Sequence, residues 1–139
     1  MINGTIVVTS IWINYYNSVK SKTSETLNKL IDSDEVIVLP VILQETLQGI
    51  KKNTVFELTK ELLLSYHYLK INSIYSAISA AELYRFLRQK GITIRKPNDC
   101  LIASICIENK IPLFHNDKDF DNIAKHTSLK IYKYQNVKN

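Results

Sequence analysis

Two kinds of hydrophobic pattern alternate along the chain: short apolar runs rich in β-branched residues, and longer stretches in which apolar residues recur every three or four positions. The short runs predict strands at 5–8, 36–39, 68–71, 112–115 and 129–132. The longer stretches predict helices over about 18–32, 40–50, 55–66, 74–90, 98–109 and 121–126. Strands that alternate with helices form a mostly parallel sheet that helices cover on both faces. The pattern therefore predicts an α/β fold, a three-layer α/β/α sandwich.

Residues with strong positional preferences mark the ends of several predicted helices. Pro40 suits the first position of its helix, where a backbone N–H is not needed. Asn98 is expected to be the N-cap of the helix over 98–109, and Gly91 is expected to end the helix over 74–90.

Length and composition predict a single domain over residues 1–139. Hydrophobic residues make up 45% of the 139 positions, which is enough for a core that needs no disulfide or zinc. Cys100 and Cys106 are six residues apart in one predicted helix. That spacing is about 9 Å, beyond the roughly 7 Å that a disulfide can bridge. We expect two free thiols, as in a reducing compartment.

The N-terminal residues lack the basic and apolar segments of a signal peptide, and no apolar run approaches the roughly 18 residues of a membrane span. We therefore expect a cytoplasmic protein without a membrane partner. Basic residues outnumber acidic ones by 18 to 13, a net charge of +5 that is compatible with a polyanionic partner.

A few of the acidic residues fall where the reactive site of a parallel sheet is expected, beyond the carboxyl ends of the strands. Glu45 follows the second strand, Asp99 begins a later helix, and Asp117 and Asp119 follow the fourth strand. Each also has a structural interpretation, as a solvated helix residue, a first-turn acid or a loop cap. If they converge, they form an oxygen-ligand site for Mg²⁺ or Mn²⁺.

Four segments carry a family resemblance: residues 6–13 (IVVTSIWI), 39–49 (LPVILQETLQG), 98–103 (NDCLIA) and 115–120 (HNDKDF). In this order and spacing, the chain resembles the PIN-domain nucleases, specifically the VapC-type toxins of bacterial toxin–antitoxin pairs. The resemblance covers nearly the whole chain. It implies a PIN-like α/β/α sandwich and a Mg²⁺- or Mn²⁺-dependent endoribonuclease that cleaves structured RNA, either tRNA or rRNA. It also implies neutralisation by a cognate VapB-type antitoxin, and we expect a homodimer.

The resemblance also implies which residues form the site. The catalytic, metal-binding acids would be Glu45, Asp99 and Asp117, with Asp119 as an auxiliary ligand. The hydroxyl residues Thr9 and Ser10 match those that order the site in the family.

Position 8 departs from the family pattern. Family members usually have an Asp at the end of the first strand, and this chain has Val8 there. Valine cannot ligate a metal ion, so we expect weakened or single-metal binding and impaired activity. Asp and Val codons differ by one base, and a toxic nuclease without its antitoxin is under selection for inactivity. A natural valine and a selected one both fit the sequence.

The arginines are candidates for RNA binding. All three fall within eleven residues, just before Asp99, and with a neighbouring lysine they give the set Arg85, Arg88, Arg95 and Lys96. The planar donor fork of arginine suits phosphate groups. The alternative is a solvated helix face. His115 and His126 are expected to pack or to form hydrogen bonds rather than to act as acid–base groups.

Two other functions remain as alternatives. Val8 favours a catalytically silent module that binds RNA or an antitoxin, whereas the retained acids favour the nuclease. A receiver-like phosphoacceptor domain is disfavoured, because it needs a pair of acids near the first strand.

Overall fold

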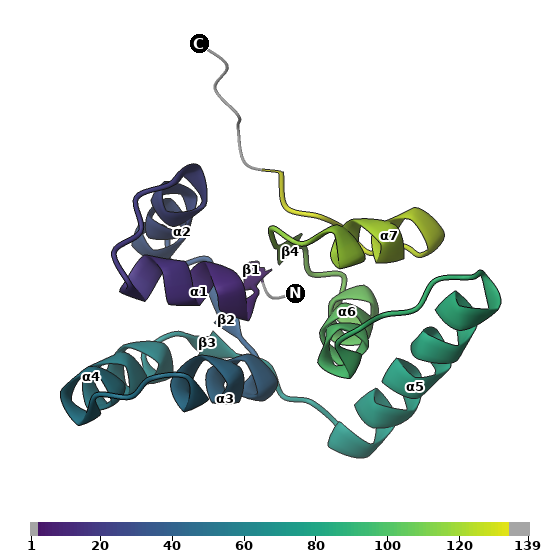
Figure 1. The fold of residues 1–139 in the computed structure, drawn as a ribbon, viewed down its shortest axis with the longest axis horizontal. Helices are drawn as coiled ribbons and strands as arrows, with labels where there is room; N and C mark the ends of the chain where they lie inside the picture. The colour runs from purple at the N-terminus through teal and green to yellow at the C-terminus, as the bar shows by residue number, and fades with distance from the viewer. Residues whose placement is uncertain (1–2, 134–139) are drawn as a thin grey trace, which may run out of the picture.

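A computed structural model describes residues 3–133 and contains a four-stranded sheet in which the strands are parallel (Figure 1). The strands lie in the order β3-β2-β1-β4, with β1 at Thr5–Val7, β2 at Val36–Val38, β3 at His67–Tyr68 and β4 at Leu113–Phe114. Ile6 of β1 pairs with β2 through Ile37 and with β4 through Leu113. The carboxyl ends of β2, β1 and β4 therefore lie next to one another.

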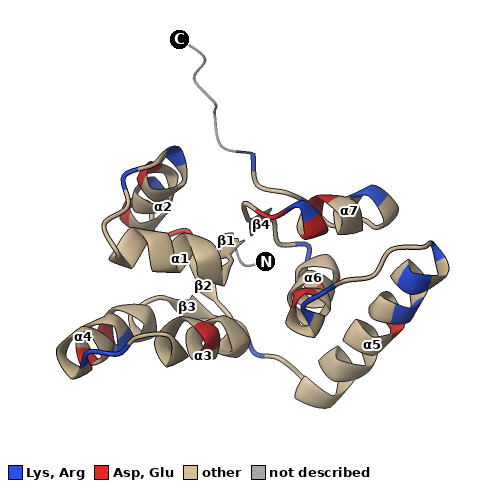
Figure 2. Cartoon of the chain, in the orientation of Figure 1, with Lys and Arg blue, Asp and Glu red and all other residues tan. Residues whose placement is uncertain are grey.

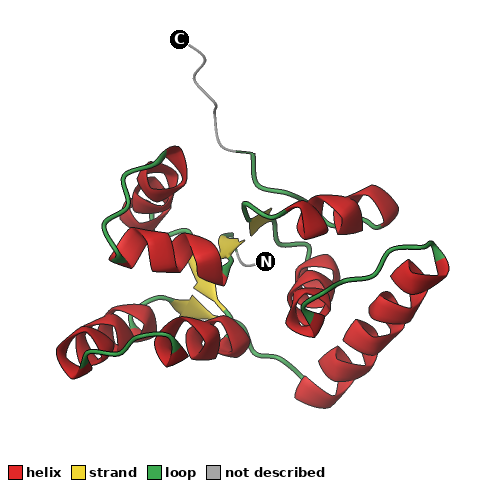
Figure 3. Cartoon of the chain, viewed as in Figure 1, coloured by secondary structure: helices red, strands yellow, loops and turns green. Residues whose placement is uncertain are grey.

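Seven helices within residues 3–133 surround this sheet (Figure 3). They are α1 (Thr9–Tyr16), α2 (Lys22–Asp32), α3 (Pro40–Gln48), α4 (Asn53–Leu64), α5 (Ser73–Gln89), α6 (Pro97–Asn109) and α7 (Lys118–His126). The pair α1 and α2 lies on one side of the sheet, and the pair α5 and α6 lies on the other (Figure 1). The predicted three-layer α/β/α sandwich is confirmed.

The helix α1 is fixed to the sheet by the largest buried side chain of the core. The indole of Trp12 is fully buried, and its Nε1 donates a hydrogen bond of 3.2 Å to the backbone oxygen of Val7. Its ring also stacks on Tyr16 and Tyr66, with centroids 5.9 and 5.4 Å away. This anchor sets the position of the first turn of α1, which borders the candidate site.

One helix was missed by the prediction, and several predicted strand boundaries are wrong. The helix α1 was not predicted, because residues 9–16 are mostly apolar and follow a strand directly, so they lack the polar face that marks a surface helix. The strand predicted at 68–71 is displaced to His67–Tyr68. The strand predicted at 129–132 is reduced to a single bridge between Ile131 and Leu113.

Two predicted helix starts are also wrong. The helix α6 begins at Pro97 with Lys96 as N-cap, because proline is well suited to the first helical position, and Asn98 lies inside the helix. The helix α7 begins at Lys118, three residues before the predicted start, because the side chain of Asp117 caps it. The expected roles of Pro40 and Gly91 are confirmed: Pro40 starts α3, and Gly91 follows α5 with φ of 81°.

The described part of the chain has neither a membrane-spanning helix nor a disulfide. No helix within residues 3–133 is long and apolar enough to cross a membrane. Cys100 and Cys106 are both buried in α6 as free thiols, as their spacing predicted.

Candidate metal centre

Acidic side chains from three elements meet at the carboxyl ends of the strands. A cavity of about 270 Å³ lies there, and its lining includes Val8, Glu45, Asp99 and Asp117. Figure 2 shows acidic residues in red on α3, on α6 and between β4 and α7. The expectation that the separate acidic segments converge at this edge of the sheet matches the geometry.

The local structure explains how the three aspartates are held. Asp99 is in the first turn of α6, and Asp119 is in the first turn of α7. Asp117 is the N-cap of α7, and its Oδ1 accepts a hydrogen bond of 3.0 Å from the backbone N–H of Asp119. Two helix N-termini therefore point their partial positive charge toward the cluster, which stabilises carboxylates there.

One compact group of potential metal ligands is found within residues 3–133. Asp99, Asp117 and Asp119 each offer one carboxylate oxygen, and these oxygens all lie within 4.8 Å of one another. Glu45 is outside this group although it lines the same cavity. Three carboxylates at this spacing are the ligands that Mg²⁺ or Mn²⁺ prefers, so the residues fit a divalent cation.

Two oxygens of the group are buried without a hydrogen-bond partner among the described residues: Oδ2 of Asp99 and Oδ2 of Asp119. Asp99 itself is only 7% exposed. The pKa of Asp99 is raised to about 6, mainly by burial; the charge of Lys96 lowers it, and the charges of Asp117, Glu45 and Asp119 contribute to the rise. A buried acid that is crowded by other acids is electrostatically frustrated in the metal-free protein.

Glu45 is held by side chains from two other helices. Its Oε1 accepts a hydrogen bond of 2.7 Å from the hydroxyl of Thr9, and its Oε2 accepts one of 3.2 Å from the amide of Asn98. Ser10, the other predicted site-ordering residue, donates to Oδ1 of Asn116 at 2.7 Å. Asn98 was predicted only as a helix cap; its place beside Asp99 in the sequence was the available signal for a role in the site.

Val8 lies at the carboxyl end of β1 and lines the acidic cavity. Its side chain is 4% exposed, and it is the N-cap of α1 without a side-chain cap bond. The position expected to carry the first acid of the family therefore borders the cluster, but it contributes methyl groups and no ligand atom.

His115 supports the loop that carries Asp117. Its Nδ1 accepts a hydrogen bond of 3.0 Å from the backbone N–H of Asp117, and its Nε2 lies 3.3 Å from Oδ1 of Asp121. Burial lowers the pKa of His115, although the nearby charge of Asp121 acts in the opposite direction. This hydrogen-bonding role agrees with the expectation for His115.

Two of the four predicted RNA-binding residues border the acids. Nζ of Lys96 is 3.9 Å from Oδ2 of Asp117, and Nε of Arg95 is 3.7 Å from Oδ2 of Asp119. Both basic side chains are mostly exposed. Arg85 and Arg88 are exposed on α5, whose basic end lies away from α3 in Figure 2.

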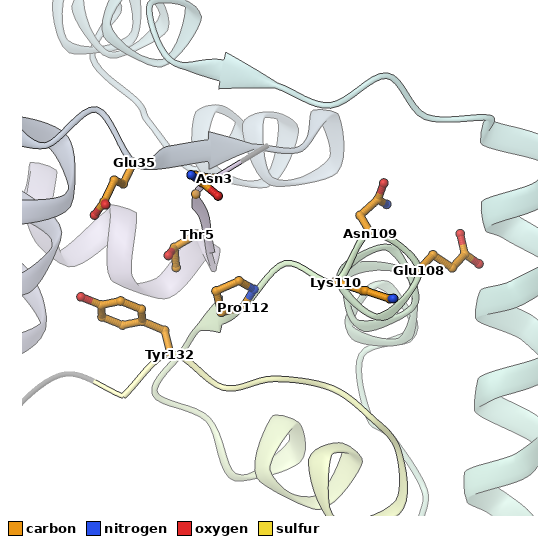
Figure 4. Close-up of a pocket in the computed structure, with 9 residues that line it drawn as sticks. Asn3, Thr5, Glu35, Glu108, Asn109, Lys110, Pro112 and Tyr132 are labelled. Carbon is orange, nitrogen blue, oxygen red and sulfur yellow. The ribbon is translucent and has the colours of Figure 1, made fainter. Parts of the chain in front are cut away.

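A larger cavity of about 510 Å³ opens at the opposite, amino end of the strands (Figure 4). The charged residues in its lining are Glu35, directly before β2, and Glu108 and Lys110, at the C-terminal end of α6. Within residues 3–133, the group of three close metal-ligating side chains lies at the other end of the sheet. The smaller acidic cavity is therefore the candidate centre.

The sequence of the chain matches a family model and two known relatives. A family model described as "PIN domain" matches residues 5–126. The VapC ribonuclease Mb1587 of Mycobacterium bovis and the ribonuclease VapC11 of Mycobacterium tuberculosis are each 27% identical over 132 residues, which cover 94% of this chain and 98% of each relative.

Solved structures show the same fold. VapBC2 from Rickettsia felis, bound to a promoter DNA fragment, matches with a TM-score of 0.71 and 22% identity over 92% of this chain and 96% of that chain. DNA-bound VapBC from Salmonella typhimurium matches with a TM-score of 0.73 and 17% identity over 94% of this chain and 97% of that chain.

Proposed function

Because the chain belongs to the PIN-domain family, confirming the resemblance in its sequence, we propose that it is a VapC-type toxin with metal-dependent endoribonuclease activity. The observation that carries the proposal is the group formed by Asp99, Asp117 and Asp119 at the carboxyl ends of the strands. The two mycobacterial relatives, which align along almost the whole chain, are named ribonucleases.

The proposed reaction is hydrolysis of an RNA phosphodiester bond. A divalent cation, Mg²⁺ or Mn²⁺, would supply a bound water of lowered pKa and neutralise charge that develops on phosphate oxygens. Glu45, Asp99 and Asp117 are the proposed catalytic acids, with Asp119 beside them. Asp99 must lose its proton to serve, and the nearby charge of Lys96 favours that loss.

The proposed substrate is structured RNA, either tRNA or rRNA. Lys96 lines the cavity and Arg95 lies beside Asp119; both are exposed and can pair with phosphates once they leave the carboxylates. Arg85 and Arg88 would extend this basic surface along α5. The net charge of +5 supports a polyanionic partner.

We also propose a VapB-type antitoxin as partner. Two solved structures of similar fold are of DNA-bound VapBC, which supports this choice. A homodimer remains a prediction, in keeping with large apolar side chains that are exposed on α4 and α5, such as Leu58 and Ile74. A cytoplasmic location and a single domain over residues 1–139 also remain predictions.

Val8 suggests that the activity of this chain is impaired, since one acid of the family pattern is missing. The same observation favours a second function, a catalytically silent module that binds RNA or the antitoxin. The retained acids favour the nuclease, because a binding module has no need of three crowded carboxylates.

The decisive experiment is digestion of total tRNA and rRNA by the purified chain, with Mg²⁺ or Mn²⁺ and with EDTA. We expect slow metal-dependent cleavage that Val8→Asp accelerates and that Asp99→Asn or Asp117→Asn abolishes, because the amide keeps the shape and loses the charge. A Val8→Asp protein that is folded and binds Mg²⁺, yet cuts no RNA, would contradict the nuclease proposal and leave the binding module.

A further inference from the structure

We infer that one divalent cation binds between Asp99, Asp117 and Asp119, and that Glu45 remains outside its ligand shell. The inference rests on the proposed metal dependence and goes further, because it selects three ligands from four candidate acids and sets the number of ions. It gives Asp119 the role of a full ligand in a chain that has valine at position 8.

The first support is the geometry of the three carboxylates. Their nearest oxygens lie within 4.8 Å of one another. Oxygens bound to one Mg²⁺ at about 2.1 Å in an octahedron lie roughly 3–4 Å apart. Small rotations of the aspartate side chains would therefore close the group around one ion.

The second support is independent of the clustering itself. Oδ2 of Asp99 and Oδ2 of Asp119 are buried and accept no hydrogen bond from the described residues. Burying a carboxylate oxygen without a partner costs stability, and such an atom in a native protein calls for a water or an ion. Asp99 is 7% exposed, so its free oxygen is directed into the protein and not toward bulk solvent.

The basic residues nearby do not replace a cation. Nε of Arg95 is 3.7 Å from Oδ2 of Asp119, and Nζ of Lys96 is 3.9 Å from Oδ2 of Asp117. Both distances exceed the length of a hydrogen bond. Because the two basic side chains are 76% and 67% exposed, they can withdraw when an ion enters.

Glu45 differs from the aspartates in its hydrogen bonding. Both of its carboxylate oxygens already accept hydrogen bonds, from Thr9 at 2.7 Å and from Asn98 at 3.2 Å. A metal bond at either oxygen would compete with a charge-assisted hydrogen bond. Both oxygens of Glu45 therefore have hydrogen-bond partners without a metal, whereas Oδ2 of Asp99 and Oδ2 of Asp119 have none among the described residues.

Val8 accounts for the position of the proposed ion on the α7 side of the cavity. An acid at position 8 would add a ligand at the carboxyl end of β1, in the cavity that Glu45 also lines. The side chain of Val8 puts methyl groups there. Within residues 3–133 one group of three carboxylates is close enough to share an ion, so a single ion beside Asp117 and Asp119 follows.

The test is a calorimetric titration of the metal-free chain with MnCl₂ at pH 7.5, together with the Mn²⁺ electron paramagnetic resonance signal to count bound ions. We expect one ion per chain. Asp119→Asn and Asp117→Asn should each weaken Mn²⁺ binding by more than about tenfold, because each variant loses a ligand. Glu45→Gln should weaken it by a factor of only roughly two to five, the effect of one screened charge.

Glu108→Gln is the matched control, since it removes one exposed carboxylate at the far end of α6. It should leave Mn²⁺ affinity unchanged. Each variant is first checked for folding by a thermal melt in EDTA. The ion count of the unchanged chain and the result for Glu45→Gln test the inference even if Asp119→Asn does not fold.

Two bound ions, or a loss of affinity in Glu45→Gln as large as that in Asp117→Asn, would overturn the inference and leave a metal-dependent nuclease in place. The absence of any Mn²⁺ binding would overturn both. One ion with the expected pattern in a chain that cuts no RNA would support the inference while the nuclease proposal fails.

Discussion

Replacing Val8 with aspartate gives the most direct test of how position 8 shapes the centre. Val8 is almost fully buried, and burial of a valine side chain contributes about 1.5–3 kcal/mol. The aspartate would recover about 1 kcal/mol as N-cap of α1, where Val8 forms no cap bond. Each added like-charge pair costs roughly 1 kcal/mol or more at the edge of the protein.

The balance of these effects predicts that Val8→Asp destabilises the metal-free chain by about 2–3 kcal/mol. Addition of Mg²⁺ at about 100 times its dissociation constant should return about 2.7 kcal/mol to this variant. If the unchanged chain binds the ion about tenfold more weakly, the same concentration stabilises it by only about 1.4 kcal/mol.

Thermal melts of both proteins in EDTA and in Mg²⁺ measure these quantities. The difference of about 1.3 kcal/mol in the response corresponds to roughly 3–6 °C for a chain of this length. Val8→Asn is the matched control, because asparagine has the shape and the capping ability of aspartate without the charge. An equal Mg²⁺ response in Val8→Asp and Val8→Asn would refute the placement of position 8 at the metal.

Three further predictions follow from the site. Because the pKa of Asp99 is raised to about 6, the folded chain holds a proton that the unfolded chain releases near pH 4. In EDTA, the free energy of unfolding should therefore fall by at most about 3 kcal/mol as the pH rises from about 4 to about 6. Urea titrations of Asp99→Asn should lack this fall. Thr9→Val removes the donor to Oε1 of Glu45 and should cost about 1–2 kcal/mol of stability in urea unfolding, with Mn²⁺ affinity altered by less than about fivefold; a larger loss of affinity would place Glu45 on the ion. Arg95→Ala should weaken RNA binding and lower its salt slope by about one while Mn²⁺ affinity persists; an unchanged slope would mean that Arg95 contacts no phosphate.

Much of the fold could be predicted from local pattern because most of its elements bury an apolar run. The run at Val36–Val38 follows polar residues, the run at Leu113–Phe114 precedes them, and both are recognisable as strands. The helix α1 was missed because its sequence is apolar around most of its circumference and its stability depends on the contact of Trp12 with β1 and two tyrosine rings. Such contacts join positions that no local window connects.

In the site too, features that follow from local sequence were predicted, and contacts between distant positions were not. The positions of Asp99 and Asp117 follow from where strands end and helices begin, which is readable in sequence. The hydrogen bonds that hold Glu45 join it to residues 36 and 53 positions away, so only the three-dimensional structure brings them together. Without knowledge of these hydrogen bonds, the sequence distinguishes Glu45 from Asp119 as a potential metal ligand only by its place in a motif.

These contacts also explain how a centre with a valine in place of its first acid can persist. Both oxygens of Glu45 accept hydrogen bonds, from the hydroxyl of Thr9 and the amide of Asn98, so this side chain is satisfied without an ion. The three aspartates lack such donors at two of their oxygens and retain a reason to bind a cation. With valine at position 8, the family's group of acids is divided into a hydrogen-bonded glutamate and a triad of aspartates that could hold a metal ion, so the proposed ion lies toward the N-terminus of α7.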